Sequence, residues 1–484
     1  MLFSTRYIAL GFLILHLSLA AALPLIDDEA YYTLWARWPA AGYYDHPPMI
    51  AYFIHLGAQI FGENSFGIRI IGLLGIACSS LLVGDTAQRL GLGQRHAALA
   101  VMLFNIGFLP LAIGSFATPD SPSTLFWIAG LWAAIAAVQS QAAPAKTCLT
   151  WWLAAGLLIG LGGASKFTNV FLGFGLLGWL VSTREGRAWL RRPYPYFAVC
   201  AAILPLIPYV NWNIQNDWLG FERQGSRLNA GGFDFGDFTG YIAALLILPT
   251  PLVGWFALRG VGIGKAPQMS LLLWSLAPVL VYFAFHATHD TVQANWLTPI
   301  QGAIAILASV ALASLTHQRF WTRITVVSGT GLSVILLGAL LNPWVPLSTD
   351  DTPPNQGRGW KAAQVEIQNL IDDTGAQWIA TTDYARTGML AYQFPSLPVY
   401  ALTDPQRYGF RPAFDPALCD APAVLIEKAD GNSSKSTQLQ TPSAIAEQMF
   451  ETSRPLQLVQ RAQGDKTLML YQATAAQGLV ALGC

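Results

Sequence analysis

The sequence predicts an α-helical polytopic membrane protein that carries a small α/β domain outside the membrane at its C-terminal end. Composition is the first observation: 53% of the 484 residues are hydrophobic and 11% are charged, whereas soluble proteins carry about 25% charged residues. The second observation is a series of apolar runs of spanning length, and the third is the gathering of basic residues in alternate loops. A bilayer can solvate that many apolar faces, whereas a soluble core cannot bury them. The net charge of zero gives no general attraction for nucleic acid.

Apolar runs follow one another through residues 1–342, which we predict to be one transmembrane domain. They lie near 7–25, 67–87, 96–115, 119–138, 193–212, 238–258, 269–287, 294–314 and 321–342. The stretch 150–183 is too long for one crossing and is interrupted at Ser165-Lys166, so we predict two shorter helices there. Together the runs predict about eleven transmembrane helices of roughly 20 residues each. A signal peptide is the alternative for the first run, because it follows Arg6 and ends in small residues.

Charged residues in the loops predict the orientation. With the N-terminus in the cytoplasm, the loops on that side carry Arg89, Arg95, Lys146, Arg184, Arg187, Arg191, Arg192, Arg259, Lys265, Arg319 and Arg323. The opposite loops carry Asp27, Asp28, Glu29, Asp45, Glu63, Asp217, Glu222, Asp234, Asp237 and Asp290. This pattern follows the positive-inside rule, and an odd number of crossings then leaves the C-terminus outside the cytoplasm.

Residues 343–484 are polar and mix two kinds of pattern. Strand-like runs lie at 378–381, 398–402 and 423–426, with a pair around 456–460 and 467–471, and helical patterns lie near 358–372, 383–393 and 443–451. We therefore predict a small α/β domain. Cys419 and Cys484 fall in it, and the compartment permits a disulfide; a disulfide and two free thiols both remain open.

The first outer loop, residues 26–66, holds the densest set of polar groups. Asp27, Asp28 and Glu29 stand where the chain leaves the membrane, followed by an aromatic stretch through Trp38 that we expect to lie along the interface. The three acids are either functional carboxylates or caps for that helix.

Later in the same loop, the sequence Tyr44-Asp45-His46 is followed by two prolines that restrict the backbone. A carboxylate and an imidazole held in this way can bind a divalent cation, with Asp45 and His46 as the metal ligands, or an anionic group. A solvated turn before the helix at 49–61 is the alternative.

Four later polar residues are further candidates. Asp120, in a Thr-Pro-Asp-Ser-Pro sequence, is either a helix N-cap or a functional carboxylate at a membrane mouth. Lys166 either snorkels to the surface or holds a phosphate. Arg227, with Arg223, is a further candidate for the phosphate, and Asn295 either faces a cavity or begins a helix.

Acids, a lysine and an aromatic shelf on the outer face suit a lipid-borne, phosphorylated substrate. A carboxylate can deprotonate a hydroxyl or stabilise a positive sugar centre, and cations can stabilise a leaving phosphate. A transporter or lipid flippase is the alternative, although carriers tend to have related halves and polar helices near the midplane, and the sequence shows no repeat. A membrane scaffold is a third reading, in which every outer acid is replaceable.

Five ordered segments carry a resemblance to a known family. They are Asp28–Tyr32, Gly42–Met49, Ala117–Pro122, Ser165–Thr168 and Asn295–Pro299. Their order and spacing resemble the bacterial branch of the protein O-mannosyltransferase superfamily, which includes the aminoarabinose transferases that modify lipid A. The resemblance covers roughly residues 1–315 and fades in 343–484.

The resemblance implies a GT-C fold in the bacterial inner membrane, a polyprenyl-phosphate sugar as donor and chemistry at the periplasmic face. The acceptor would be a membrane lipid such as lipopolysaccharide, a glycan or a protein. Asp28 matches the catalytic carboxylate and Glu29 its partner. Asp120 matches the second acidic position and Lys166 a lysine near the lipid phosphate.

Tyr44, His46, Arg227 and Asn295 join the expected substrate-binding residues. The lipid A enzymes have Glu-Lys where this chain has Asp45-His46. That departure leaves the identity of the sugar and any need for a divalent metal cation open.

Overall fold

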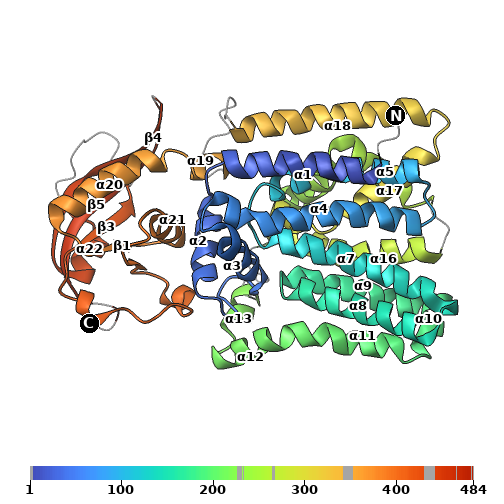
Figure 1. The fold of residues 1–484 in the computed structure, drawn as a ribbon, viewed down its shortest axis with the longest axis horizontal. Helices are drawn as coiled ribbons and strands as arrows, with labels where there is room; N and C mark the ends of the chain where they lie inside the picture. The colour runs from blue at the N-terminus through green and yellow to red at the C-terminus, as the bar shows by residue number, and fades with distance from the viewer. Residues whose placement is uncertain are drawn as a thin grey trace. The chain divides into compact units, whose positions relative to one another are not determined.

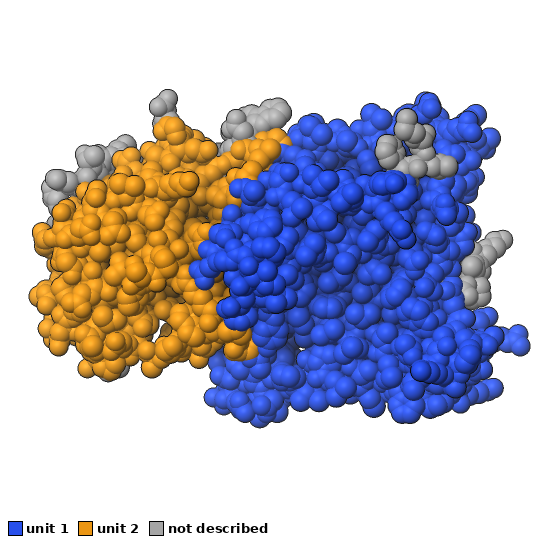
Figure 2. Space-filling view, viewed as in Figure 1, with its two compact units in different colours: residues 1–21, 41–337 blue, residues 22–40, 338–484 orange. Residues whose placement is uncertain are grey.

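The computed structural model describes residues 4–484 except 226–231, 233, 264–266, 342–352, 430–441, 465, 481 and 483. Arg227 and Lys265 therefore lie outside the described residues. The chain divides into two compact units, shown in Figure 2: unit 1 is Met1–Ala21 with Ala41–Leu337, and unit 2 is Ala22–Ala40 with Gly338–Cys484.

Unit 1 is a bundle of membrane helices (Figure 1). Among the described residues, seven helices are long and apolar enough to cross a bilayer: Thr5–Ala22 (α1), Ser65–Arg89 (α4), Asp120–Ala142 (α7 with η1), Ala145–Gly163 (α8), Tyr194–Gln215 (α11 to α12), Met269–His286 (in α16, which begins at Pro267) and Gln318–Leu341 (α18). The helices α14 (Phe235–Ile247) and α15 (Pro251–Gly260) form an eighth candidate that bends by 91°. The prediction of a polytopic helical protein is confirmed.

The other helices of unit 1 are shorter. They are α3 (Met49–Phe61), α5 (Gln94–Asn105), α6 (Phe108–Ile113), α9 (Val170–Ser182), α10 (Arg184–Leu190), α13 (Leu219–Gly225) and α17 (Gln301–Ala313). The run expected at 96–115 is thus divided into α5 and α6, and the run expected at 294–314 begins as a 3-10 turn, η5 (Ala294–Leu297), before α17. The stretch 150–183 is two helices, with the predicted break at Ser165-Lys166 followed by η2 (Phe167–Asn169).

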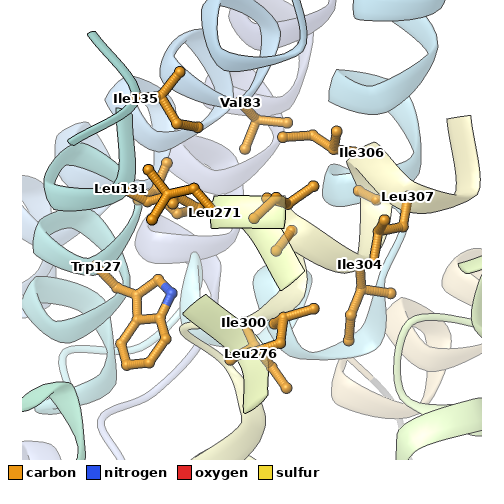
Figure 3. Packing of buried hydrophobic residues seen from close by; sticks show 14 of the residues in the cluster. Val83, Trp127, Leu131, Ile135, Leu271, Leu276, Ile300, Ile304, Ile306 and Leu307 are labelled. Atoms are coloured by element: carbon orange, nitrogen blue, oxygen red, sulfur yellow. The ribbon is translucent and has the colours of Figure 1, made fainter. Parts of the chain in front are cut away.

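The centre of unit 1 is α7. Its spanning window is 83% buried, against 22% for α1 and α18. Trp127, Leu131 and Ile135 are four residues apart, so they lie on one face of α7, where they belong to the buried core that Figure 3 shows. Val83 from α4, Leu271 from α16 and Ile304 from α17 belong to the same core. A helix buried on most of its surface can carry polar groups at its end without exposing them to lipid. Asp120, the first residue of α7, is such a group.

Unit 2 contains a five-stranded sheet with strand order β2-β1-β3-β5-β4. The strands are β1 (Trp378–Thr381), β2 (Val399–Ala401), β3 (Ala423–Lys428), β4 (Phe450–Gln463) and β5 (Lys466–Leu479). β1 runs parallel to β2 and β3, and β5 runs antiparallel to β3 and β4. The helices of this unit are α2 (Asp27–Arg37), α19 (Pro353–Gln356), α20 (Trp360–Thr374), α21 (Tyr384–Gln393) and α22 (Ala444–Met449). The predicted α/β domain is confirmed, and its last two strands are longer than the sequence pattern indicated.

The first outer helix differs most from expectation. We predicted an interfacial helix belonging to the transmembrane domain, but α2 folds with the C-terminal residues in unit 2. Tyr31 and Trp35 are 2% and 0% exposed, and Tyr31 packs 5.1 Å from Tyr384 of α21 between ring centroids. Gly388 permits this packing, because a Cβ there would lie 2.5 Å from the Tyr31 nitrogen. The aromatic side chains that suggested a membrane surface instead form a protein core.

Of the two alternatives for the C-terminal cysteines, the structure has the disulfide. Cys419 and Cys484 are bonded, with their Cα atoms 5.7 Å apart. Cys419 follows the short turn η7 (Pro416–Leu418), and Cys484 ends the chain after β5. The bond links the segment that follows β5 to the segment between η7 and β3.

Candidate functional site

Three of the predicted site residues meet in unit 1. The Asp120 Oδ1 accepts a hydrogen bond from Lys166 Nζ at 2.6 Å, and Oδ2 accepts one from Asn295 Nδ2 at 2.9 Å. Asp120 begins α7, Lys166 lies between α8 and η2, and Asn295 lies in η5. Each therefore lies where a membrane helix begins or ends, although 175 residues separate the ends of the set.

The ion pair is buried, with side-chain exposures of 7% for Lys166 and 3% for Asp120. Pro119 occupies the N-cap position of α7, and the start of that helix has no side-chain capping bond. Asp120 is therefore not the cap that the sequence left as an alternative, and Lys166 is not a lysine snorkelling to the surface. Both carboxylate oxygens of Asp120 are used to hold other side chains.

Ser123 and Asn169 form a second link between the segments that carry Asp120 and Lys166. Asn169 donates from Nδ2 to the Ser123 carbonyl at 2.8 Å and accepts from Ser123 Oγ at 2.7 Å. Ser123 stands three residues after Asp120, and Asn169 three residues after Lys166, so the same two segments are joined twice. A Cβ at Gly162 would lie 2.8 Å from Asn169 Nδ2, so a glycine is needed at that point. Sequence reasoning missed Ser123 and Asn169; their matched spacing was the available signal.

The ammonium group of Lys166 lies at the wall of a small pocket. The pocket holds about 50 Å³, which is room for three or four water molecules. Its lining residues are His46, Lys166, Phe167, Thr168, Gln224, Tyr282, Phe283, His286 and Trp296. Among the described residues, Asp120 is the one hydrogen-bond partner of the Lys166 ammonium, so two of its three N–H donors remain for a ligand. The structure thus places His46 and Lys166 at one cavity.

Asp45 and Tyr44 both contact an arginine of α13. Arg223 Nε lies 3.7 Å from Asp45 Oδ1, and its guanidinium carbon lies 5.4 Å from the centre of the Tyr44 ring. Gln224 of the same helix donates to the Asp45 carbonyl at 2.7 Å. Tyr44 and Asp45 thereby contact Arg223, one of the two arginines that the sequence offered for the phosphate.

The described residues do not fit a metal centre at Asp45 and His46. No group of three or more His, Cys, Asp or Glu side chains within the described part of the chain could hold a metal ion. The carboxylate of Asp45 also lies beside a guanidinium, which competes for the same oxygens. We therefore derive no chemical step through a metal.

The other predicted carboxylates lie in unit 2. Glu29 is fully buried, and its Oε2 accepts the backbone N–H of Ile26 at 3.1 Å, which is the contact of a helix-capping side chain. Asp28 is partly exposed, and its Oδ1 accepts a hydrogen bond from the Tyr384 hydroxyl at 3.4 Å. Of this pair, Asp28 is the carboxylate that a substrate can reach.

Asp27, on the same helix, has a perturbed carboxyl. Burial raises its pKa to about 7; Arg461 opposes the rise, and Asp28 adds to it. A carboxyl that exchanges its proton near neutral pH is suited to acid or base chemistry. The sequence showed three acids in a row but not which of them would have its pKa raised in the folded unit.

The chain is similar to known proteins in sequence and in fold. A family model described as dolichyl-phosphate-mannose-protein mannosyltransferase matches residues 45–212. An undecaprenyl phosphate-α-4-amino-4-deoxy-L-arabinose arabinosyl transferase from Edwardsiella ictaluri is 27% identical over 329 residues, which cover 62% of this chain and 56% of the relative. The crystal structure of ArnT from Cupriavidus metallidurans bound to undecaprenyl phosphate has the same fold, with a TM-score of 0.65 at 16% identity over 99% of this chain and 98% of that one. The chain is thus similar to protein mannosyltransferases over residues 45–212, and it shares the fold of ArnT.

A second relative and the lengths matched describe this similarity further. A lipid A galacturonosyltransferase from Rhizobium johnstonii is 25% identical over 291 residues, covering 58% of this chain and 59% of the relative. The chain thus spans little more than half the length of the curated relatives that it matches. The likeness in fold extends through unit 2, where the sequence resemblance fades, so the shared GT-C fold includes both units.

Proposed function

We propose that this protein transfers a sugar from a polyprenyl-phosphate donor to an acceptor at the periplasmic face of the bacterial inner membrane. The observation that carries the proposal is the buried Asp120–Lys166–Asn295 set at the wall of a pocket. Relatives named for undecaprenyl-phosphate and lipid A chemistry support it, and so does the fold shared with a protein that binds undecaprenyl phosphate.

The donor phosphate is assigned to Lys166. A compact ammonium with two unused donors suits a phosphate oxygen, and Asp120 and Asn295 keep the lysine in place before the ligand arrives. His46, on the same pocket, adds a titratable donor or acceptor.

The acceptor is activated by Asp28 in this proposal. The carboxylate takes the proton of the acceptor hydroxyl, whose oxygen attacks the anomeric carbon of the sugar. The bond between that carbon and the phosphate oxygen breaks, and polyprenyl phosphate leaves with the electron pair. Lys166 stabilises the charge on the leaving phosphate. The acceptor is a lipid such as lipopolysaccharide, a glycan or a protein, and the sugar is a hexose or a pentose.

Mass spectrometry of envelope lipids and glycans, with and without the gene, tests this assignment in the cell. We expect one sugar to disappear from a defined glycan while the matching polyprenyl-phosphate sugar accumulates. An unchanged profile in cells that express the protein would contradict the proposal. Uptake of the donor into proteoliposomes without any sugar transfer would favour a transporter or flippase instead.

A further inference from the structure

Unit 2 contains a second pocket, which is remote in sequence from Asp120, Lys166 and Asn295. It holds about 250 Å³ and is lined by Tyr400, Ala401, Pro405, Tyr408, Gly409, Arg411, Pro412, Ala413, Phe414 and Leu482. Ala401 ends β2, and the segment that follows this strand supplies most of the walls. Ligands of open parallel sheets bind outside the carboxyl ends of the strands, and β2 and β1 are parallel.

Arg411 is the charged group of this pocket, and no acid accompanies it. Its Nη1 donates to the Val399 carbonyl at 2.8 Å, while its Nε is buried without a hydrogen-bond partner. Burial lowers the pKa of Arg411; Tyr400 and Tyr408 oppose this shift, and the nearby cation Arg37 adds to it. Within the described part of the chain, no carboxylate forms an ion pair with Arg411, unlike Arg386 and Arg407, which pair with Asp383 and Asp404.

Arg411 is partly buried. A guanidinium removed from water without a counter-ion is costly to a fold, and it remains charged at neutral pH. Its planar fork of donors matches a carboxylate or a phosphate in a bidentate arrangement. The chemistry at the charged end of the pocket therefore selects an anion.

Aromatic rings form the other walls. The Arg411 guanidinium carbon lies 4.8 Å from the centre of the Tyr400 ring, and the Tyr400 and Phe414 rings lie 4.7 Å apart at an angle of 62°. Tyr408 and two prolines complete the lining. A concave site of aromatic walls with one placed charge is typical of a small-molecule site, here one that takes a ring bearing an acidic group.

We propose that this pocket binds an acidic sugar unit, with Arg411 on its carboxylate or phosphate and Tyr400, Tyr408 and Phe414 against its ring. The anion follows from Arg411 alone, whereas the choice of a sugar rests on the proposed function. The small domain then holds an acidic glycan through contacts that are separate from the Lys166 pocket.

Calorimetric titration of the purified full-length protein in detergent, without donor, tests this inference. The probes are glucuronate, glucose 6-phosphate, glucose and inorganic phosphate. We expect saturable binding of one or both acidic sugars, at least tenfold weaker binding of glucose and of inorganic phosphate, and at least a tenfold loss in Arg411→Gln. Arg454→Gln removes the same charge from an exposed position on β4 and is expected to bind as the wild type does.

Three results would overturn the inference. They are no binding of either acidic sugar, equal binding by Arg411→Gln, or equal affinity for inorganic phosphate and the sugar phosphate. If Arg411→Gln does not fold, Ala413→Trp fills the pocket from an exposed position and is expected to abolish binding. Because the titration needs no transfer, a protein that binds acidic sugars but transfers none would refute only the proposed function.

Discussion

At the scale of single residues, we expect the buried ion pair between Lys166 and Asp120 to stabilise the folded protein. Breaking a buried pair by removing one partner costs about 3–5 kcal/mol, whereas replacing both by apolar residues is often neutral. We expect Lys166→Met to lower the free energy of unfolding by that amount, and Lys166→Met with Asp120→Leu to recover most of it. Thermal unfolding in detergent measures the stability.

A measurement of sugar transfer separates the structural role of this pair from the role of Lys166 in binding the donor phosphate. The double variant is expected to stay inactive although its stability returns, because no ammonium remains for the donor phosphate. A double variant that transfers sugar at the wild-type rate would contradict the role given to Lys166.

The raised pKa of Asp27 leads to a second prediction for a single residue. Because the folded-state pKa is raised from 3.8 to about 7, the folded protein holds a proton that the unfolded chain releases between these values. The wild type should therefore lose stability relative to Asp27→Asn as the pH rises from about 4 to about 7. Unfolding temperatures of both proteins at pH 5 and pH 8 measure the difference. The same comparison with Asp420→Asn, an exposed carboxylate of unit 2, is the control and should show no such trend.

At the scale of elements, α8 and α11 are held together by two glycines. A Cβ at Gly156 would collide with the Ala198 carbonyl, and one at Gly160 with the Ala202 carbonyl. Their spacing is the small-residue pattern by which membrane helices approach closely. We expect Gly156→Val to destabilise the protein by about 1–3 kcal/mol, measured by thermal unfolding. Gly240→Val is the control, because a Cβ there meets nothing within 4 Å; equal losses in the two variants would contradict the packing.

Sequence patterns predicted elements better than they predicted contacts. The break at Ser165-Lys166, β1 at 378–381 and the helix at 383–393 follow from local composition, which periodicity records. The bond from Asn295 to Asp120 does not, because its two residues are 175 positions apart. For a related reason, the aromatic pattern of α2 predicts a helix at the membrane interface, whereas the structure buries Tyr31 and Trp35 in unit 2. Periodicity shows that a face is apolar but not whether lipid or protein covers it.

At the scale of the whole molecule, the chain crosses between its two units more than once. The helix that carries Asp28 belongs to unit 2 with residues 338–484. We expect deletion of 345–484 to expose Tyr31 and Trp35, because α21 is removed, and so to end transfer to every acceptor instead of changing the acceptor preference. Hydrogen exchange of the peptide 27–37 measures the effect. Equal protection of that peptide in the truncated and full-length proteins would show that α2 folds without the C-terminal residues.

The most direct test of the central claim is transfer by the purified protein in nanodiscs. The substrates are polyprenyl-phosphate sugars and acceptor lipids extracted from the envelope, and the products are followed by mass spectrometry. We predict that the wild type and Asp420→Asn release polyprenyl phosphate as the sugar appears on the acceptor. Asp28→Asn should release none while keeping its fold and its level in the membrane. Full transfer by Asp28→Asn would contradict the catalytic assignment, and no transfer by the wild type from any of these donors would contradict the proposed function.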